Sequence, residues 1–509
     1  MRRFISVVLL TLALLPTGAR ADDPLPDAAT IRAKVQAASP APPGYRETTV
    51  TVVSNGETRT VHRIERGSDW RNITERGPFH TESGEIKGEA WHQNDNGQSV
   101  FDQADPGEAK SDPTTTTITR VHTPVEAYVV AELNARGWGV RRYVDPATWH
   151  VVRIESLGPN GNVTTVYDDF REDAGRTFAH HWSTVSEYAR TTSDAHVTAY
   201  DPSPVTDAEL AMPESRRMLV EFPADAQSAD LPVQFGQGHI FVRITINGRG
   251  LDFTLDTGAS GITLDNQVAR ELGLTEYEKT STVTAQRYTT ARTIVPEMHV
   301  GKLTMHNVAL QLVPDGANEV YGVKTVGLLG FDFLAELGVT IDYEHERVTV
   351  VPESSYAAPS GRYVIPLDVR IGDGTPVVNV TINGALSERF TIDTGGAGTL
   401  MIFDAFARKH PEALVDKGGG DALRQMTFAG IGGNLSTKAY QLDSVHIGPI
   451  NMSNFVAYLV TSSNSYAGDD DGIVGPTFLR FFTVGLDYAK SRIYLVPNDV
   501  GRRAMHIRD

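Results

Sequence analysis

The sequence predicts a mainly β protein in which a separate antiparallel β domain precedes two similar β-rich units. Two observations carry this prediction. Short runs of β-branched and aromatic residues, separated by Gly, Asn, Asp and Pro turns, follow one another along the chain. In addition, the triplet Asp-Thr-Gly occurs at residues 256–258 and 393–395, each time after a similar strand-and-turn pattern. We therefore expect a duplicated unit that brings two aspartates together.

Length and composition are those of an ordinary globular protein. The chain has 509 residues, of which 40% are hydrophobic and 21% are charged, so about three domains are expected. The formal net charge of -17 argues against a nucleic-acid partner, because phosphate binding needs a cationic surface.

Residues 1–21 predict a secretory signal peptide. Arg2 and Arg3 precede the apolar stretch from Ile5 to Leu15, and small residues form a cleavage site before Asp22. This stretch is too short to cross a bilayer. The chain has no cysteine, so a disulfide, a thiolate site or the acylated cysteine of a lipoprotein anchor cannot form. We expect an exported protein, periplasmic or extracellular, with no integral membrane segment after signal removal.

Residues 22–217 predict an N-terminal β-rich domain. It begins with a short helical stretch and a Pro-rich break at residues 37–44, and its strand-like part starts at Tyr45. Residues 124–136 are its clearest helix prediction. The predicted strands are 48–53, 58–65, 140–143, 150–156 and 162–168.

All five tryptophans of the chain lie in this N-terminal domain, and we expect them to pack in its core. The domain loosely resembles the curved sheets of lipoprotein carriers. Binding of an apolar ligand, holding of substrate and action as an inhibitory prosegment all remain open as its role. The tryptophans are Trp70, Trp91, Trp138, Trp149 and Trp182.

The two predicted units span residues 218–355 and 356–509. Beyond the triplets, residues 328–343 align without gaps to residues 473–488, and both stretches then enter a strand that ends in Val-Pro. Asp393 follows Asp256 by 137 residues, which is a normal domain size. Each unit thus contributes one aspartate, and duplication with a shared site indicates docking around a pseudo-twofold axis.

Paired aspartates in such turns have a definite chemistry. At the end of an apolar strand, ionisation of a carboxyl is costly. Two carboxyls that meet there share one proton, because two adjacent charges cannot both persist. One carboxylate then activates water as a general base, while the other protonates the scissile carbonyl or its leaving nitrogen. Asp256 and Asp393 are therefore the predicted catalytic pair, and this chemistry needs no metal or other cofactor.

In these motifs the chain resembles the bacterial retropepsin-like (gag-pol-type) aspartyl proteases, over about residues 218–500. The resemblance implies tandem acid-protease β-barrel lobes with Asp256 and Asp393 as the dyad. It also implies that Thr257 and Thr394 cross-bond beneath the dyad. Four glycines would support the site. Gly258 and Gly395 belong to the two turns, and Gly330 and Gly475 end the Leu-Leu-Gly element (residues 328–330) and the Ile-Val-Gly element (residues 473–475).

The resemblance further implies a flap that closes over substrate. Its candidates in the second unit are Gly430, Gly432 and Gly433, whereas the corresponding segment of the first unit contains Tyr288 and no glycine. One flap can therefore dominate, or this lobe covers the cleft differently.

The residue after each triplet departs from the pepsin-like pattern. Pepsin-like members carry Ser or Thr there, and this chain carries Ala259 and Gly396. Ala259 in particular is nearer the viral pattern. Both replacements remove a hydroxyl that tunes the dyad.

Other chemistries have little support in the sequence. His80, His92 and the pair His180-His181 lack the spacing of a zinc site, so no metal is predicted. No GxSxG elbow and no phosphate-binding loop occur.

The sequence thus predicts an exported aspartic-type endopeptidase that hydrolyses a polypeptide substrate as a monomer with pseudo-twofold lobes. Two alternatives stay open. The first is a catalytically weak or inactive aspartic-protease-like binding protein of the cell envelope. The second is a homodimer in which each lobe supplies half of a site.

Overall fold

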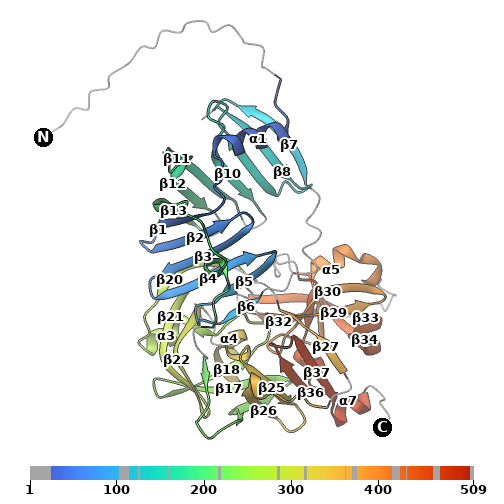
Figure 1. Ribbon diagram of the computed structural model, residues 1–509. Coiled ribbons are helices and arrows are strands. Elements are labelled where there is room, and N and C mark those ends of the chain that lie inside the picture. The colour runs from blue at the N-terminus through green and yellow to red at the C-terminus, as the bar shows by residue number, and fades with distance from the viewer. Residues whose placement is uncertain are drawn as a thin grey trace, which may run out of the picture.

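The computed structural model is mainly β, and its described residues form four sheets (Figure 1). The predicted signal peptide lies outside the described residues. In the described part of the chain, no helix combines the length and apolar character needed to cross a membrane. The described residues are 24–101, 114–123, 126–158, 161–187, 189–215, 219–283, 287–314, 318–360, 363–369, 375–414, 425–430, 433–461 and 470–504.

The N-terminal part of the chain forms one antiparallel sheet of 13 strands. The strands follow chain order except that β1 pairs with β13, which places the first and last hairpins side by side. In spatial order they are β6 (Ser99–Phe101), β5 (Glu89–Gln93), β4 (Phe79–Ile86), β3 (Asp69–Arg76), β2 (Thr58–Arg66), β1 (Tyr45–Val53), β13 (Thr191–Asp201), β12 (Arg176–Ser186), β11 (Val163–Asp173), β10 (Val151–Leu157), β9 (Gly139–Val144), β8 (Ala127–Leu133) and β7 (Thr115–Val121). Helix α1 (Ala28–Ala38) packs on this sheet through Ile31, and α2 (Asp207–Leu210) follows it.

The helix predicted at residues 124–136 is wrong. Residues Ala127–Leu133 form strand β8, which pairs with β7 and β9. Its β-branched pair Val129-Val130 favours an extended backbone, and the neighbouring strands satisfy its backbone hydrogen bonds. All five strands predicted in this domain are present as β1, β2, β9, β10 and β11.

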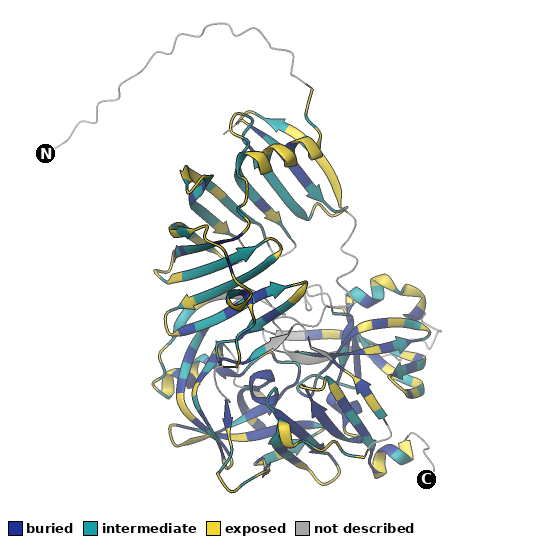
Figure 2. Cartoon of the chain, in the orientation of Figure 1, coloured by how far each residue is buried: buried dark blue, intermediate teal, exposed yellow. Residues whose placement is uncertain are grey.

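The tryptophans of the N-terminal sheet are less buried than predicted. Trp91 is 1% exposed, but the other four are half-buried. The sheet stands as a single layer over much of its area, and Figure 2 shows intermediate and exposed residues along most of its strands. A layer without a second layer on top cannot bury a large core.

The first unit is built on a ten-stranded sheet. Strand β18 lies parallel to β24, and this pairing places the end of β18 beside the Leu-Leu-Gly element. The strands are β14 (Val220–Glu221), β16 (Val233–Gly236), β17 (His239–Ile246), β18 (Arg249–Leu255), β19 (Thr263–Asp265), β20 (Tyr277–Val283), β21 (Arg287–Val300), β22 (Leu303–Val313), β23 (Asn318–Val320) and β24 (Val323–Leu329), with helices α3 (Asn266–Glu271) and α4 (Phe331–Leu334).

The second unit repeats this arrangement on an eight-stranded sheet. Strand β30 lies parallel to β35, as β18 does to β24. The strands are β28 (Asp368–Val369), β29 (Pro376–Ile382), β30 (Ala385–Ile392), β31 (Leu400–Ile402), β32 (Gln425–Gly430), β33 (Gly433–Ile447), β34 (Ile450–Val460) and β35 (Gly472–Val474), with α5 (Asp404–Lys409), the 3-10 helix η3 (Pro411–Leu414) and α6 (Pro476–Leu479).

A six-stranded sheet joins the two units. Strands β25 and β36 pair antiparallel at its centre, with Thr340 opposite Gly485. These two positions are equivalent in the sequence repeat, so a pseudo-twofold axis passes between them. The strands are β15 (Ala229–Asp230), β26 (Arg347–Pro352), β25 (Leu337–Asp342), β36 (Phe482–Asp487), β37 (Arg492–Pro497) and β27 (Tyr363–Pro366), flanked by the 3-10 helix η2 (Glu353–Ser355) and by α7 (Asp499–Ala504).

One hydrophobic cluster of buried side chains extends from Leu219 to Leu495 through these three sheets. The two units therefore share a continuous core, which fixes the loops that lie between them.

Candidate active site

The first Asp-Thr-Gly turn begins where β18 ends. The Asp256 amide donates to the Leu329 carbonyl at 3.0 Å, so the neighbouring strand β24 fixes the start of the turn. The Gly258 amide donates to Oδ1 of Asp256 at 2.8 Å. The turn thus aims the carboxyl group with its own backbone.

The second turn has the same geometry at the end of β30. The Asp393 amide donates to the Val474 carbonyl at 3.0 Å, and the Gly395 amide donates to Oδ1 of Asp393 at 2.9 Å. The two turns are therefore equivalent in space as well as in sequence.

Four hydrogen bonds between Thr257 and Thr394 and the opposite strands join the two turns. The amide of each threonine donates to the hydroxyl of the other, at 3.1 and 3.0 Å. The Thr257 hydroxyl donates to the Ile392 carbonyl and the Thr394 hydroxyl to the Leu255 carbonyl, both at 2.7 Å. Both threonines are 0% exposed, so water does not compete for these bonds.

The two carboxyl groups meet above the threonines. Asp256 and Asp393 are in side-chain hydrogen-bond contact. Burial raises the pKa of Asp256 well above its ordinary value, and the Asp393 charge raises it further. Burial also raises the pKa of Asp393, but the hydrogen bond from Asp256 opposes that rise. The two carboxyls therefore share one proton, with the more buried Asp256 as its carrier.

Only glycine fits beside these carboxyls. A Cβ at Gly258 would lie 2.7 Å from Cγ of Asp393, and a Cβ at Gly395 would lie 2.4 Å from Cγ of Asp256. Each turn therefore packs its glycine against the aspartate of the other unit, and this close approach brings the two carboxyls together.

Gly330 and Gly475 allow the Leu-Leu-Gly and Ile-Val-Gly elements to pack closely against the loop that follows the Asp-Thr-Gly turn of the same unit. A Cβ at Gly330 would lie 2.4 Å from the Ala259 carbonyl, and a Cβ at Gly475 would lie 2.5 Å from the Gly398 carbonyl. The Gly475 amide donates to the Thr399 carbonyl at 2.9 Å. These glycines serve packing and take no part in chemistry.

The packing gives a physical reason for Gly396. A Cβ there would lie 2.6 Å from Oδ2 of Asp393 and 2.6 Å from Cδ1 of Ile473, so the hydroxyl residue of pepsin-like loops does not fit this backbone. Backbone hydrogen bonds from Ala259 and Gly396 instead reach Asp256 and Asp393 and lower their pKa values. The backbone thus stabilises each carboxylate where a hydroxyl would do so in the pepsin-like pattern.

The flap candidates belong to two equivalent hairpins. In the second unit, β32 and β33 pair as far as Gly430 opposite Gly433, and Gly432 lies outside the described residues. In the first unit, β20 and β21 form the hairpin, and the backbone of Tyr288 pairs with Thr282. The side chain of Tyr288 also lies outside the described part.

The sequence did not single out two residues that lie beside the site. His239 begins β17 and is buried, and burial lowers its pKa while backbone hydrogen bonds to Gly396 and Gly236 oppose that shift. Asp332, in α4, is 9% exposed and lies against residues 256–262, the first catalytic loop. The sequence repeat could have pointed to Asp332, because this residue lies two positions after Gly330.

We expect Gly395→Ala to disrupt the site. The added methyl overlaps the Asp256 carboxyl, so the variant should lose about 1–3 kcal/mol of stability and at least about 100-fold in kcat. Urea denaturation and peptide hydrolysis measure the two effects. Gly158→Ala is the matched control, because the nearest atom to its added Cβ lies 3.9 Å away. Wild-type turnover in Gly395→Ala would contradict the described packing.

Comparison with known proteins supports the duplication. The model of a family described as aspartyl protease matches the chain twice, at residues 242–333 and 378–478. Each match contains one Asp-Thr-Gly turn and the Gly330 or Gly475 element that passes under it. No curated protein matches the chain.

Similarity to solved structures is weak. A LolA superfamily protein from Nitrosomonas europaea is 10% identical, covering 36% of this chain and 97% of its own, with a TM-score of 0.27. Basic 7S globulin from soybean is 12% identical, covering 54% of this chain and 96% of its own, with a TM-score of 0.33. Both TM-scores are too low to carry an argument about the fold.

Proposed function

We propose that the chain is an aspartic endopeptidase with two retropepsin-like lobes in tandem, and that Asp256 and Asp393 are its catalytic dyad. The observation that carries this proposal is the meeting of two equivalent Asp-Thr-Gly turns, locked by four buried hydrogen bonds. Both halves of the site come from one chain, so a monomer is sufficient for activity.

The shared proton defines the roles of the two carboxyls. Asp393, the more exposed partner, takes a proton from a water molecule as the water oxygen attacks the peptide carbonyl carbon. Asp256 gives its proton to the carbonyl oxygen, which yields a neutral tetrahedral intermediate. This intermediate collapses as the C–N bond breaks. The leaving nitrogen receives the proton that Asp393 took from water, and one hydroxyl of the intermediate returns its proton to Asp256, which restores the dyad. Every step uses residues of this chain and water alone.

The hairpins β32–β33 and β20–β21 are the proposed flaps over the cleft between the lobes. An extended polypeptide is the substrate class that such a cleft accepts, because hairpin backbones can pair with an extended backbone. With the predicted signal peptide of residues 1–21, we propose that this peptidase acts after export, in the periplasm or outside the cell.

The experiment that tests this function is hydrolysis of a denatured protein by the purified mature chain across pH, with and without a statine-type transition-state mimic. We expect a bell-shaped profile. Activity falls at low pH because both carboxyls become protonated, and at high pH because the shared proton, held at raised pKa, is lost. Inhibition by the mimic identifies a competent dyad, since such mimics bind far more tightly than substrates.

Binding of the mimic without turnover at any pH would favour the inactive envelope binding protein. Activity that disappears on dilution, together with a doubled mass in solution, would favour the homodimer.

A further inference from the structure

The loop between β5 and β6 of the N-terminal sheet is bonded directly to α4 of the first unit. Asn94 Nδ2 donates to Oδ1 of Asp332 at 2.7 Å, and Asn96 Nδ2 donates to Oδ2 at 2.9 Å. Gln98 Nε2 donates to the Asp332 carbonyl at 2.8 Å. Three amide side chains of one domain thus hold a single residue of another.

The same loop also extends to the sheet of the first unit. Asn96 is 2% exposed, and it exchanges two hydrogen bonds with the backbone of Ala309 in β22, at 2.9 and 3.2 Å. Amides buried in this way are costly to leave unpaired, so the contact is specific and not an incidental touch between surfaces.

Asp332 in turn supports the loop that carries Asp256. A Cβ at Gly261 would lie 3.0 Å from Oδ2 of Asp332, and a backbone hydrogen bond from Ile262 reaches the same carboxyl. The Phe331 amide donates to the Ala259 carbonyl at 2.9 Å. A continuous chain of contacts therefore runs from Asn94 and Asn96 through Asp332 to the first catalytic loop.

Among its described residues, the second unit has no equivalent of this contact. Thr477 occupies the position that Asp332 has in the repeat, and its amide donates to the Gly398 carbonyl at 3.1 Å. The carboxylate and its amide partners therefore belong to one half of an otherwise symmetric site. An asymmetry of this kind requires an explanation specific to the N-terminal domain.

Other contacts make the docking extensive. Arg292 pairs with Asp95 and Arg76 with Glu278 across the same interface. A cavity of about 700 Å³ lies beside the contact, with Ser260 and Gly261 of the first catalytic loop in its lining.

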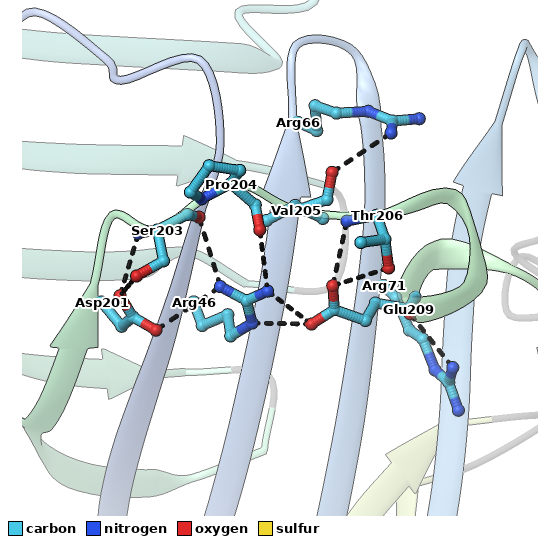
Figure 3. A network of polar contacts seen from close by, with 9 residues as sticks. All are labelled: Arg46, Arg66, Arg71, Asp201, Ser203, Pro204, Val205, Thr206 and Glu209. Carbon is cyan, nitrogen blue, oxygen red and sulfur yellow. Dashed lines mark hydrogen bonds and ion pairs between the residues drawn. The ribbon is translucent and has the colours of Figure 1, made fainter.

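Hydrogen bonds and an ion pair hold residues 203–209, which follow the N-terminal sheet, against Arg46 of that sheet (Figure 3). Arg46 donates to the Ser203 and Pro204 carbonyls at 3.2 and 3.1 Å and pairs with Glu209. Hydrogen bonds from Thr206 and Arg46 lower the pKa of Glu209 to about 2. Residues 203–209, which follow the sheet, are therefore fixed against it.

We propose that the loop of residues 94–98 is a permanent positioning element of the first catalytic loop and acts through Asp332. This inference rests on the proposed peptidase function. On this view the N-terminal domain is an integral part of the active enzyme and not a removable inhibitory prosegment. Asp332 is a positioning residue, since it touches the loop and not the reacting atoms.

The charged form of the Asp332 carboxyl is stabilised by its hydrogen-bond partners. Burial raises its pKa to about 7, and the hydrogen bonds from Asn96 and Asn94 oppose this rise. Without the two amides the buried carboxyl loses donors on both oxygens, and the backbone of Gly261 and Ile262 loses a fixed support.

The test is the double variant Asn94→Ala/Asn96→Ala in the full chain, with Asn134→Ala as the matched control. Asn134 accepts hydrogen bonds from the Arg136 and Trp138 amides in the β8–β9 turn, so its loss removes similar bonds in the same sheet away from Asp332. We expect kcat to fall at least about 10-fold with little change in KM. Amide hydrogen exchange should increase at residues 257–262 and stay unchanged at residues 394–398.

Two outcomes would overturn the proposal. Higher activity in the double variant would identify the N-terminal domain as inhibitory. Unchanged kcat with unchanged exchange at residues 257–262 would show that the loop does not position the site. If the wild type hydrolyses no peptide, the proposed function fails, but the exchange measurement still decides whether the loop positions residues 257–262.

Discussion

Asp256→Asn and Asp393→Asn are each expected to abolish peptide hydrolysis while leaving the fold intact. An amide cannot share a proton with a carboxylate, so the dyad loses either its acid or its base. General acid–base catalysis contributes about 10²- to 10⁴-fold at each step. Because one dyad supplies both functions, we expect kcat to fall by at least about 10³-fold. Steady-state hydrolysis of a peptide, at the pH optimum of the wild type, measures this loss.

The same substitution has a predictable effect on stability. Burial and the neighbouring charge raise the pKa of Asp256 above its unfolded value, so the folded state retains a proton that the unfolded state releases. Stability conferred by this proton is complete below the unfolded pKa of about 3.9 and is lost as the pH rises towards the folded pKa. Asp256→Asn removes this dependence, and its melting temperature at pH 7 should equal or exceed that of the wild type.

Asp252→Asn is the control for both measurements. Asp252 lies on β18, four residues before Asp256, and pairs with Arg243 at 2.7 Å near the surface, where such pairs contribute little. Unchanged turnover in either dyad variant would refute the catalytic assignment. Loss of turnover together with a large drop in melting temperature would instead assign the aspartates a structural role.

The repeated part of the chain could be read from its sequence because local pattern and global fold agree there. The strand before each triplet, the turn and the later Gly element recur in both units. The two stretches that match without gaps, residues 328–343 and 473–488, contain β25 and β36, which pair with each other in the structure. The contact between Thr257 and Thr394 follows from family resemblance, since no local pattern specifies which residues meet across a twofold axis.

The N-terminal domain was harder to interpret for physical reasons. Its strands alternate clearly, yet β8 was expected to be helical because its apolar residues suit either period. Its docking was not predictable at all. Asn94 and Asn96 lie 238 and 236 residues before Asp332 in sequence, and short polar loops carry no periodicity that identifies a partner.

The second large effect is a loss of stability, which we expect when the threonines beneath the dyad are replaced. In Thr257→Val the Ile392 carbonyl loses its donor and the Thr394 amide loses its acceptor. Both groups are buried, and an unsatisfied buried group costs about 1–3 kcal/mol. We therefore expect a loss of about 2–6 kcal/mol in the free energy of unfolding, measured by urea denaturation. The same argument applies to Thr394→Val, which removes the other two bonds.

Thr257→Ser keeps the hydroxyl and is the matched control, which should retain most of the stability. The double variant Thr257→Val/Thr394→Val tests whether the four bonds act as one unit. The two single substitutions share no hydrogen bond, but both loosen the same contact between the units, so the second loss should cost less than the first. Strict additivity would mean that the turns stay together without the threonines. A loss below about 1 kcal/mol in Thr257→Val would mean that water or a repacked neighbour replaces the hydroxyl, and the cross-bonds would then not be what holds Asp256 against Asp393.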